Sequence, residues 1–138
     1  MSKVAIIYWS GTGNTQAMAE AIAAAAKEKG AEADLLTCSE VGDLSAYSAV
    51  ALGCPAMGVE ELEDSEFLPM LEKAEPQIVG KKVALFGSYG WGDGEWMRSW
   101  EARCKEKGIA LPFGSVMAHE IPDAAVLAAC KSLGETLA

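Results

Sequence analysis

The chain has 138 residues, of which 20 are Asp or Glu and 11 are Lys or Arg, so its formal net charge is −9. Nucleic acid and anionic membranes are excluded as partners because like charges repel, whereas a protein with a basic face is the natural complement. The length predicts one domain over residues 1–138 and leaves no room for the two cofactor domains of most self-contained dehydrogenases and reductases.

Neither targeting segments nor metal sites are expected. The apolar run at residues 4–9 is too short for a signal peptide, and no stretch of 18 residues is apolar throughout. With His119 as the only histidine and no Cys-x-x-Cys pair, a zinc site is not expected. We therefore expect a cytoplasmic protein with reduced, mostly buried thiols. These are Cys38, Cys54, Cys104 and Cys130.

Short apolar runs alternate along the chain with segments of helical periodicity. In chain order, the pattern predicts strand 4–8, helix 14–29 followed by Gly30, strand 33–38, a weak helix near 40–47, strand 50–53, helix 64–75 despite Pro69, strand 83–86, helix 94–107, a strand within 109–118 bent at Pro112 and Gly114, and a last helix from Pro122. The buried helix positions are expected at Met18, Ile22 and Ala25, at Trp96, Trp100 and Cys104, and at Val126, Leu127, Cys130 and Leu133.

This alternation predicts an α/β fold, a doubly wound parallel sheet of five strands with helices on both faces. In such sheets a ligand binds beyond the carboxyl ends of the strands. The loops after strands 4–8, 50–53 and 83–86 are therefore the places to search for a site.

The first of these loops combines two glycines, three hydroxyls and one amide with no charge, from Ser10 through Gly11, Thr12, Gly13 and Asn14 to Thr15. Backbone N–H groups and the following helix N-terminus make such a loop a phosphate cradle. A P-loop would need Gly-Lys-Ser/Thr at its end, and a dinucleotide fingerprint would need a third glycine where Gln16 stands. The alternative is an ordinary tight turn with a Ser/Thr cap.

The second loop holds Met57, whose polarizable side chain suits contact with a ring, and Gly58, which permits two peptide orientations. Cys54 is not part of a phosphatase loop, because the sixth residue after it is Glu60 rather than Arg. In the third loop Trp91 stands between Gly90 and Gly92, where its indole can stack on a flat ligand.

The alternative for Trp91 is an exposed aromatic that binds a protein partner. Phe86 stands where a serine-hydrolase elbow would need its first glycine, and His119 is expected to be a surface residue rather than a general base. Acidic residues border the same edge and predict either a docking rim or a merely solvated face. This acidic rim consists of Glu60, Glu61, Glu63, Asp64, Glu66 and Asp93.

Together these motifs resemble the short-chain flavodoxins, in particular those of strict anaerobes, and the resemblance runs the whole length of the chain. It rests on residues 8–15, on 56–58 with Glu60, and on 83–96. The family implies bound FMN and the strand order 2-1-3-4-5.

The resemblance also implies roles for single residues. Met57 and Trp91 would enclose the isoalloxazine ring, Glu60 would accept from flavin N3–H, and the Gly58 carbonyl would turn toward N5. The phosphate would be held by Ser10, Thr12, Asn14 and Thr15 with the backbone of Gly11 and Gly13. The remaining contacts would come from Pro55, Ala56, Ser88, Tyr89, Gly90, Gly92 and Asp93.

The implied function is a low-potential, monomeric electron carrier, not an enzyme, that shuttles its FMN between semiquinone and hydroquinone and docks basic-faced oxidoreductases on the acidic rim. Pro55 and Val59 depart from relatives that have Ser and Asp there. The rival interpretations are a reductase acting on quinone or NAD(P)H and a phosphate-binding signalling module without flavin.

Overall fold

The computed structural model describes residues 2–57, 61–90 and 92–138. Five parallel strands form one sheet in the order β2-β1-β3-β4-β5, which confirms the expected topology. The strands are β1 (Lys3–Tyr8), β2 (Glu32–Thr37), β3 (Ala49–Gly53), β4 (Lys82–Tyr89) and β5 (Val116–His119).

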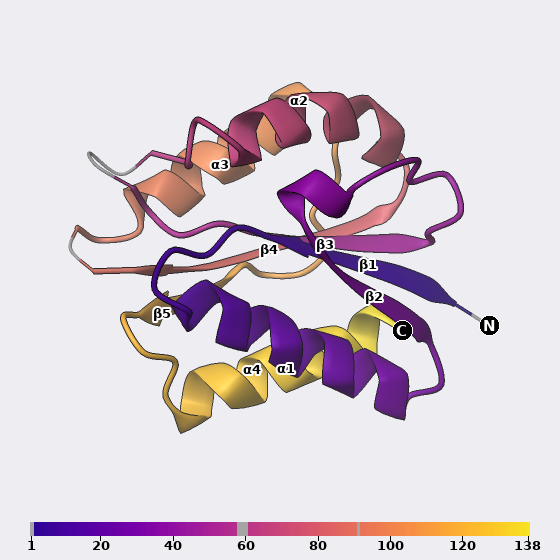
Figure 1. Cartoon of the computed structure of the whole chain (residues 1–138), viewed down its shortest axis with the longest axis horizontal. Helices are drawn as coiled ribbons and strands as arrows, with labels where there is room; N and C mark the ends of the chain where they lie inside the picture. The colour runs from indigo at the N-terminus through magenta and orange to yellow at the C-terminus, as the bar shows by residue number, and fades with distance from the viewer. Residues whose placement is uncertain (1, 58–60, 91) are drawn as a thin grey trace.

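Four α-helices connect and cover the strands. They are α1 (Asn14–Glu28), α2 (Phe67–Ile78), α3 (Glu95–Glu106) and α4 (Ala124–Leu137). Figure 1 shows α2 and α3 on one face of the sheet and α1 and α4 on the other. Both faces of the sheet are therefore covered, as a parallel sheet with apolar strands requires.

The two faces of β3 differ in the size of their side chains. Val50 and Leu52 of β3 belong to the core beneath α2 and α3, whereas Ala49 and Ala51 belong to the core beneath α1 and α4. Small residues let α1 and α4 approach closely, and a Cβ added at Gly134 would lie 2.3 Å from the carbonyl oxygen of Ile22.

The expected helix faces are buried with one exception. Met18, Ile22, Ala25, Trp96, Trp100, Cys104, Cys130 and Leu133 are all buried. Val126 is partly buried, but Leu127 keeps 38% of its surface exposed, so its place on the buried face was predicted wrongly. The apolar stripe of α4 is narrow because α4 packs mainly against α1 and the short edge strand β5.

The weak helix expected near residues 40–47 is absent, because the chain forms only a 3₁₀ turn at Cys38–Glu40. Thr37 and Glu40 form a capping box around this turn, in which the Glu40 carboxylate accepts from the Thr37 N–H at 2.8 Å. Asp43 then accepts from the Ser45 N–H at 2.9 Å, a local bond that competes with helix formation.

Helix α2 covers Phe67–Ile78 rather than the predicted 64–75. Pro69 is compatible with the helix because it lies in the first turn, where backbone N–H groups lack intrahelical acceptors. Pro76 lies inside the helix, which continues for only two residues beyond it.

The last strand is shorter than the segment 109–118 that was expected to contain it. Strand β5 covers only Val116–His119 and pairs only with β4, from Phe86 opposite Val116 to Tyr89 opposite His119. The residues before it follow Gly108 at φ 75° and include Pro112, which has no backbone N–H to donate to a ladder.

Candidate functional site

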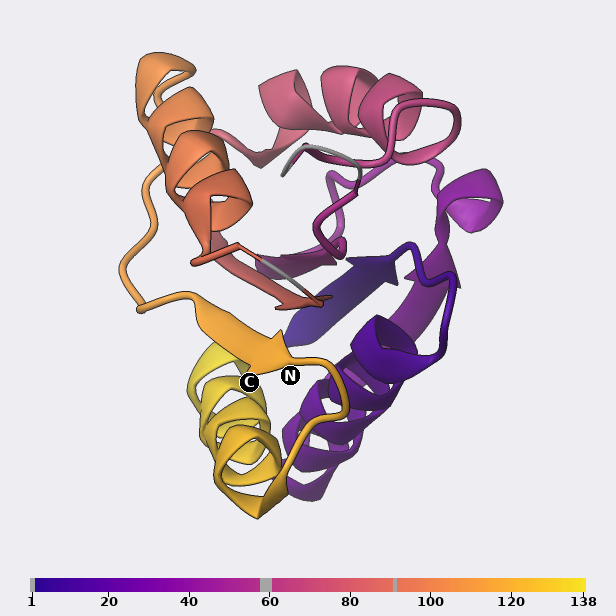
Figure 2. The same ribbon diagram turned by 90° about the vertical axis from the view of Figure 1, so that its left-hand side faces the viewer.

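Three loops meet at the carboxyl edge of the sheet, which faces the viewer in Figure 2. Tyr8 at the end of β1 lies opposite Gly53 at the end of β3, and Gly53 lies opposite Phe86 of β4. Strand β4 then runs on to Tyr89 beside β5. The loops that follow β1, β3 and β4 therefore start from neighbouring points, and we call their meeting place the candidate site.

The loop after β1 is ordered around the hydroxyl of Ser10. This oxygen accepts hydrogen bonds from the N–H of Gly13 at 3.0 Å and of Gln16 at 3.3 Å. Gly13 has φ 94°, a left-handed conformation that glycine adopts without strain. The turn therefore needs a glycine at this position, and the Ser10 hydroxyl keeps its own proton free to donate.

The donors of this loop fit a phosphate. The N–H groups of Thr12, Asn14 and Thr15 have no hydrogen bond to any described group, and the last two belong to the open first turn of α1. The first turn also contains no acidic residue that would repel an anion. An anion here would be held by N–H groups and the helix dipole without a basic side chain.

Ser88, near the end of β4, joins all three loops. Its hydroxyl lies 3.0 Å from the Thr15 hydroxyl, and its carbonyl accepts from the Ala56 N–H at 3.0 Å. Thr15 and Ser88 are both buried. These contacts bring the sequence-predicted residues of the three loops to one place. The Thr15 hydroxyl is paired with Ser88, and the backbone N–H of Thr15 remains available to a ligand.

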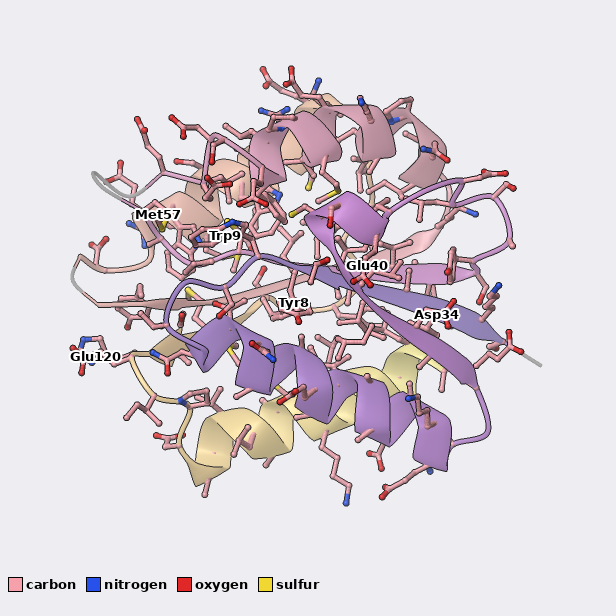
Figure 3. All side chains as sticks on the ribbon, in the orientation of Figure 1. Tyr8, Trp9, Asp34, Glu40, Met57 and Glu120 are labelled. Atoms are coloured by element: carbon pink, nitrogen blue, oxygen red, sulfur yellow. The ribbon has the colours of Figure 1, made fainter. Side chains whose placement is uncertain are left out.

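The loop after β3 holds Met57 at the molecular surface. Met57 and Glu61 exchange two backbone hydrogen bonds, of 2.8 and 2.9 Å, that form an isolated antiparallel bridge. Met57 is 36% exposed, and Figure 3 shows it at the same end of the molecule as Trp9 and Glu120. The predicted roles of Gly58, Glu60 and Trp91 fall outside the described residues, as does Val59.

The loop after β4 begins with Tyr89 and Gly90. The Tyr89 ring packs on Trp96 with centroids 5.5 Å apart and on His119 with centroids 5.1 Å apart. Gly92 and Gly94 both have left-handed φ values, of 86° and 93°, so this loop depends on glycine at two positions.

Glu63 was predicted to belong to the acidic rim, and the structure corrects this. Its side chain is buried, and its carboxylate accepts from the N–H groups of Ser65, Glu66 and Phe67 and from the Ser65 hydroxyl. These bonds outweigh partial desolvation and lower the pKa of Glu63 to about 2. Glu63 thus fixes the start of α2 and is not available to a docking partner.

Two further residues that position the site were missed from the sequence. The Trp9 N–H donates to Glu66 at 3.3 Å, and the Trp9 ring lies 3.2 Å from where a Cβ at Gly11 would be. The Trp96 N–H donates to the Cys54 carbonyl at 3.0 Å. The helical spacing of Trp96 predicted its burial. No signal in the sequence predicted that Trp9 would bond to Glu66 or Trp96 to the Cys54 carbonyl.

The cysteines are free thiols, as expected, and all but Cys38 are buried. Burial raises the pKa of Cys54 to about 12, so this thiol stays protonated and cannot act as a phosphatase nucleophile. Among the described ranges, no cluster of His, Cys, Asp or Glu is suited to a metal ion, and no helix is long and apolar enough to cross a membrane.

Comparison with known proteins agrees with this geometry. The sequence model of the family described as flavodoxin matches residues 6–132. A flavodoxin from Megasphaera elsdenii is 49% identical over 137 residues, covering 98% of each chain, and one from Clostridium beijerinckii is 48% identical over 122 residues, covering 87% of this chain and 88% of the relative.

A solved structure supports the same conclusion. The solution structure of two-electron reduced Megasphaera elsdenii flavodoxin superposes with a TM-score of 0.88 at 47% identity and covers 97% of both chains. The chain therefore belongs to the flavodoxin family, whose members are not enzymes but carry electrons on bound FMN.

Proposed function

We propose that the candidate site binds FMN with its phosphate on the loop of residues 10–15 and its ring between the loops after β3 and β4. The observation that carries this proposal is the set of unpaired backbone N–H groups at Thr12, Asn14 and Thr15, next to the Ser10 hydroxyl. The first turn of α1 favours a dianion through its partial positive charge. Because the loop has no Lys or Arg, recognition rests on hydrogen bonds of fixed direction.

When bound, FMN supplies the redox chemistry by taking up and releasing electrons singly. Met57 provides an exposed thioether for one face of the ring, and Trp91 would cover the other. The backbone of Tyr89 and Gly90 would contact the pyrimidine edge, and Glu60 would accept from N3–H. Such apolar stacking excludes water from the ring.

The peptide of Gly58 would offer its carbonyl to N5. The paired hydrogen bonds between Met57 and Glu61 hold both ends of the segment that contains Gly58. A change of peptide orientation at Gly58 would then leave Met57 and Glu61 in place, so the proposed response to reduction would be local.

Partners would dock on the rest of the acidic rim, which without Glu63 consists of Glu60, Glu61, Asp64, Glu66 and Asp93. Glu61 and Asp64 also line a groove of about 700 Å³ between α2 and α3, together with Glu95 and Glu106. We propose that a monomeric, cytoplasmic, single-domain carrier presents this groove to oxidoreductases with basic faces, whose charges would complement it.

Replacing Ser10 by Ala tests the phosphate cradle. The change removes the acceptor for the Gly13 and Gln16 N–H groups and one donor to the phosphate, at a cost of about 1–2 kcal/mol. We expect the Kd for FMN, measured by quenching of flavin fluorescence, to rise about 5- to 30-fold. Ser132→Ala, at an exposed position on α4, is the matched control. An unchanged Kd in Ser10→Ala would contradict the proposed cradle.

A further inference from the structure

His119 lies at the carboxyl end of β5, where it borders the loop after β4. Its ring packs on Tyr89 with centroids 5.1 Å apart and planes at 36°, and its Nε2 lies 3.2 Å from the carbonyl oxygen of Gly90. The pairing of Tyr89 with His119 in the sheet places both contacts at the edge of the candidate site.

The contact with Gly90 defines where the imidazole carries its proton. A carbonyl oxygen only accepts, so Nε2 must bear a hydrogen for this bond to exist. The ring is held in place by Tyr89 on one side, and the backbone that carries it is tied to β4 because the Glu120 N–H donates to the Tyr89 carbonyl at 2.8 Å. The Nε2–H of His119 therefore donates to Gly90 from a ring whose position is fixed by its neighbours.

Gly90 depends on this donor. Within the described ranges, Gly90 makes no second hydrogen bond, it is exposed, and a Cβ at its position would meet nothing within 4 Å. A glycine so weakly held has a wide choice of peptide orientations. The His119 bond therefore holds the Gly90 carbonyl in one direction.

We propose that His119 is a positioning residue that orients the Gly90 peptide for the pyrimidine edge of the flavin. This inference rests on the proposed function, in which the backbone of Tyr89 and Gly90 contacts that edge. His119 itself touches no flavin atom; it lowers the cost of ordering the loop on binding, because the peptide is already held before the ligand arrives.

Two variants separate the donor from the ring. His119→Gln keeps an N–H donor at the reach of Nε2 but removes the aromatic contact with Tyr89, and His119→Phe keeps an aromatic ring but removes the donor. The Kd for FMN is measured for the wild-type chain and both variants by fluorescence quenching. Urea unfolding of the FMN-free proteins verifies that each is folded.

The proposal predicts that His119→Phe raises the Kd about 3- to 10-fold, the effect of one net hydrogen bond, and that His119→Gln stays within about 2-fold of wild type. The reverse pattern, with weak binding only in His119→Gln, would show that ring packing is what matters and would overturn the proposal. Equal Kd values in all three chains would overturn it as well. A wild-type chain that binds no FMN would instead overturn the proposed function.

Discussion

At the scale of single residues, the carboxylate of Glu63 receives three backbone N–H bonds and one hydroxyl bond within the segment that leads into α2. Charge-assisted bonds of this kind are about twice as strong as neutral ones. The same segment is tied to the loop after β3, because the Glu63 N–H donates to the Cys54 thiol at 3.4 Å. Glu63 therefore links the start of α2 to the candidate site.

We predict that Glu63→Gln lowers the free energy of unfolding by about 2 kcal/mol at neutral pH, because its amide group presents N–H groups to a site built from donors. Urea unfolding measures the change. Asp64→Asn, at the neighbouring exposed position, is the control and should change stability by less than about 0.5 kcal/mol.

The same pair of proteins tests the pH dependence. The pKa of Glu63 is lowered to about 2 in the folded chain from its ordinary value of 4.5, so its stabilisation is complete above the ordinary value. The stability difference between wild type and Glu63→Gln should therefore shrink as the pH falls from about 5 toward 2. A difference that stays constant over that range would contradict the role assigned to the carboxylate.

Glu63 also shows why single residues of a site are hard to predict from sequence. It stands in a run of acidic residues that all look like candidates for a solvated rim. What distinguishes it is that three N–H groups of the following turn close around it, a property of the folded loop and not of composition. Trp9 and Trp96 were missed for the same reason, since their acceptors, Glu66 and Cys54, lie far from them in sequence.

At the scale of elements, α2 and α3 are joined by a largely buried ion pair. Glu75 is 3% exposed and accepts from Arg103 Nε at 2.7 Å and from its terminal nitrogen at 2.9 Å. Lys107 lies 3.6 Å from the same carboxylate. Because α2 follows the Met57 loop and α3 follows the Gly90 loop, this pair holds together the two helices that support the candidate site.

We predict that Arg103→Met lowers the free energy of unfolding by about 3 kcal/mol, because it removes both hydrogen bonds to the buried Glu75 carboxylate and leaves only the partly exposed Lys107, 3.6 Å away, as its partner. The double variant Glu75→Leu with Arg103→Met should recover most of that loss, since it buries no unpaired charge. Urea unfolding of the two single variants and the double variant measures the coupling. Purely additive losses would contradict a coupled ion pair.

Periodicity predicted the existence of the strands and helices better than their ends. Strands β1 to β4 and helix α1 are confirmed to within three residues because each is bounded by a loop or glycine at a fixed place. Helix α2 begins later than predicted because Glu63 organises the preceding turn, and β5 is short because it pairs only with the end of β4. The ends of these elements are set by tertiary contacts, which the hydrophobic periodicity of the sequence does not reveal.

At the scale of the whole molecule, the alternation of apolar strands and helices was sufficient to predict the parallel sheet and the edge that carries the candidate site. The described residues of the motifs at 10–15, 56–58 and 88–96 lie on or beside the three loops that the topology brings together. The net charge of −9 was sufficient to predict that the electrostatic field is negative. It was not sufficient to predict which carboxylates remain exposed.

We predict that charge on the acidic rim controls encounter with basic partners. A variant with Glu61→Lys and Asp64→Lys should reduce cytochrome c, used as a basic probe, about 10-fold more slowly at low ionic strength. Glu20→Lys with Glu28→Lys makes the same change in net charge on α1, which covers the opposite face of the sheet, and should have a smaller effect. The difference should vanish in high salt. Equal slowing in both variants would show that net charge, not the rim, governs encounter.

The most direct test of the central claim is a stepwise reduction of the purified protein with FMN, followed by absorption and potentiometry. We expect one FMN bound per chain and two separated one-electron steps, because the proposed site would surround the ring with fixed dipoles and negative charge. A protein that binds no FMN, or that takes up both electrons in a single unresolved step, would contradict it.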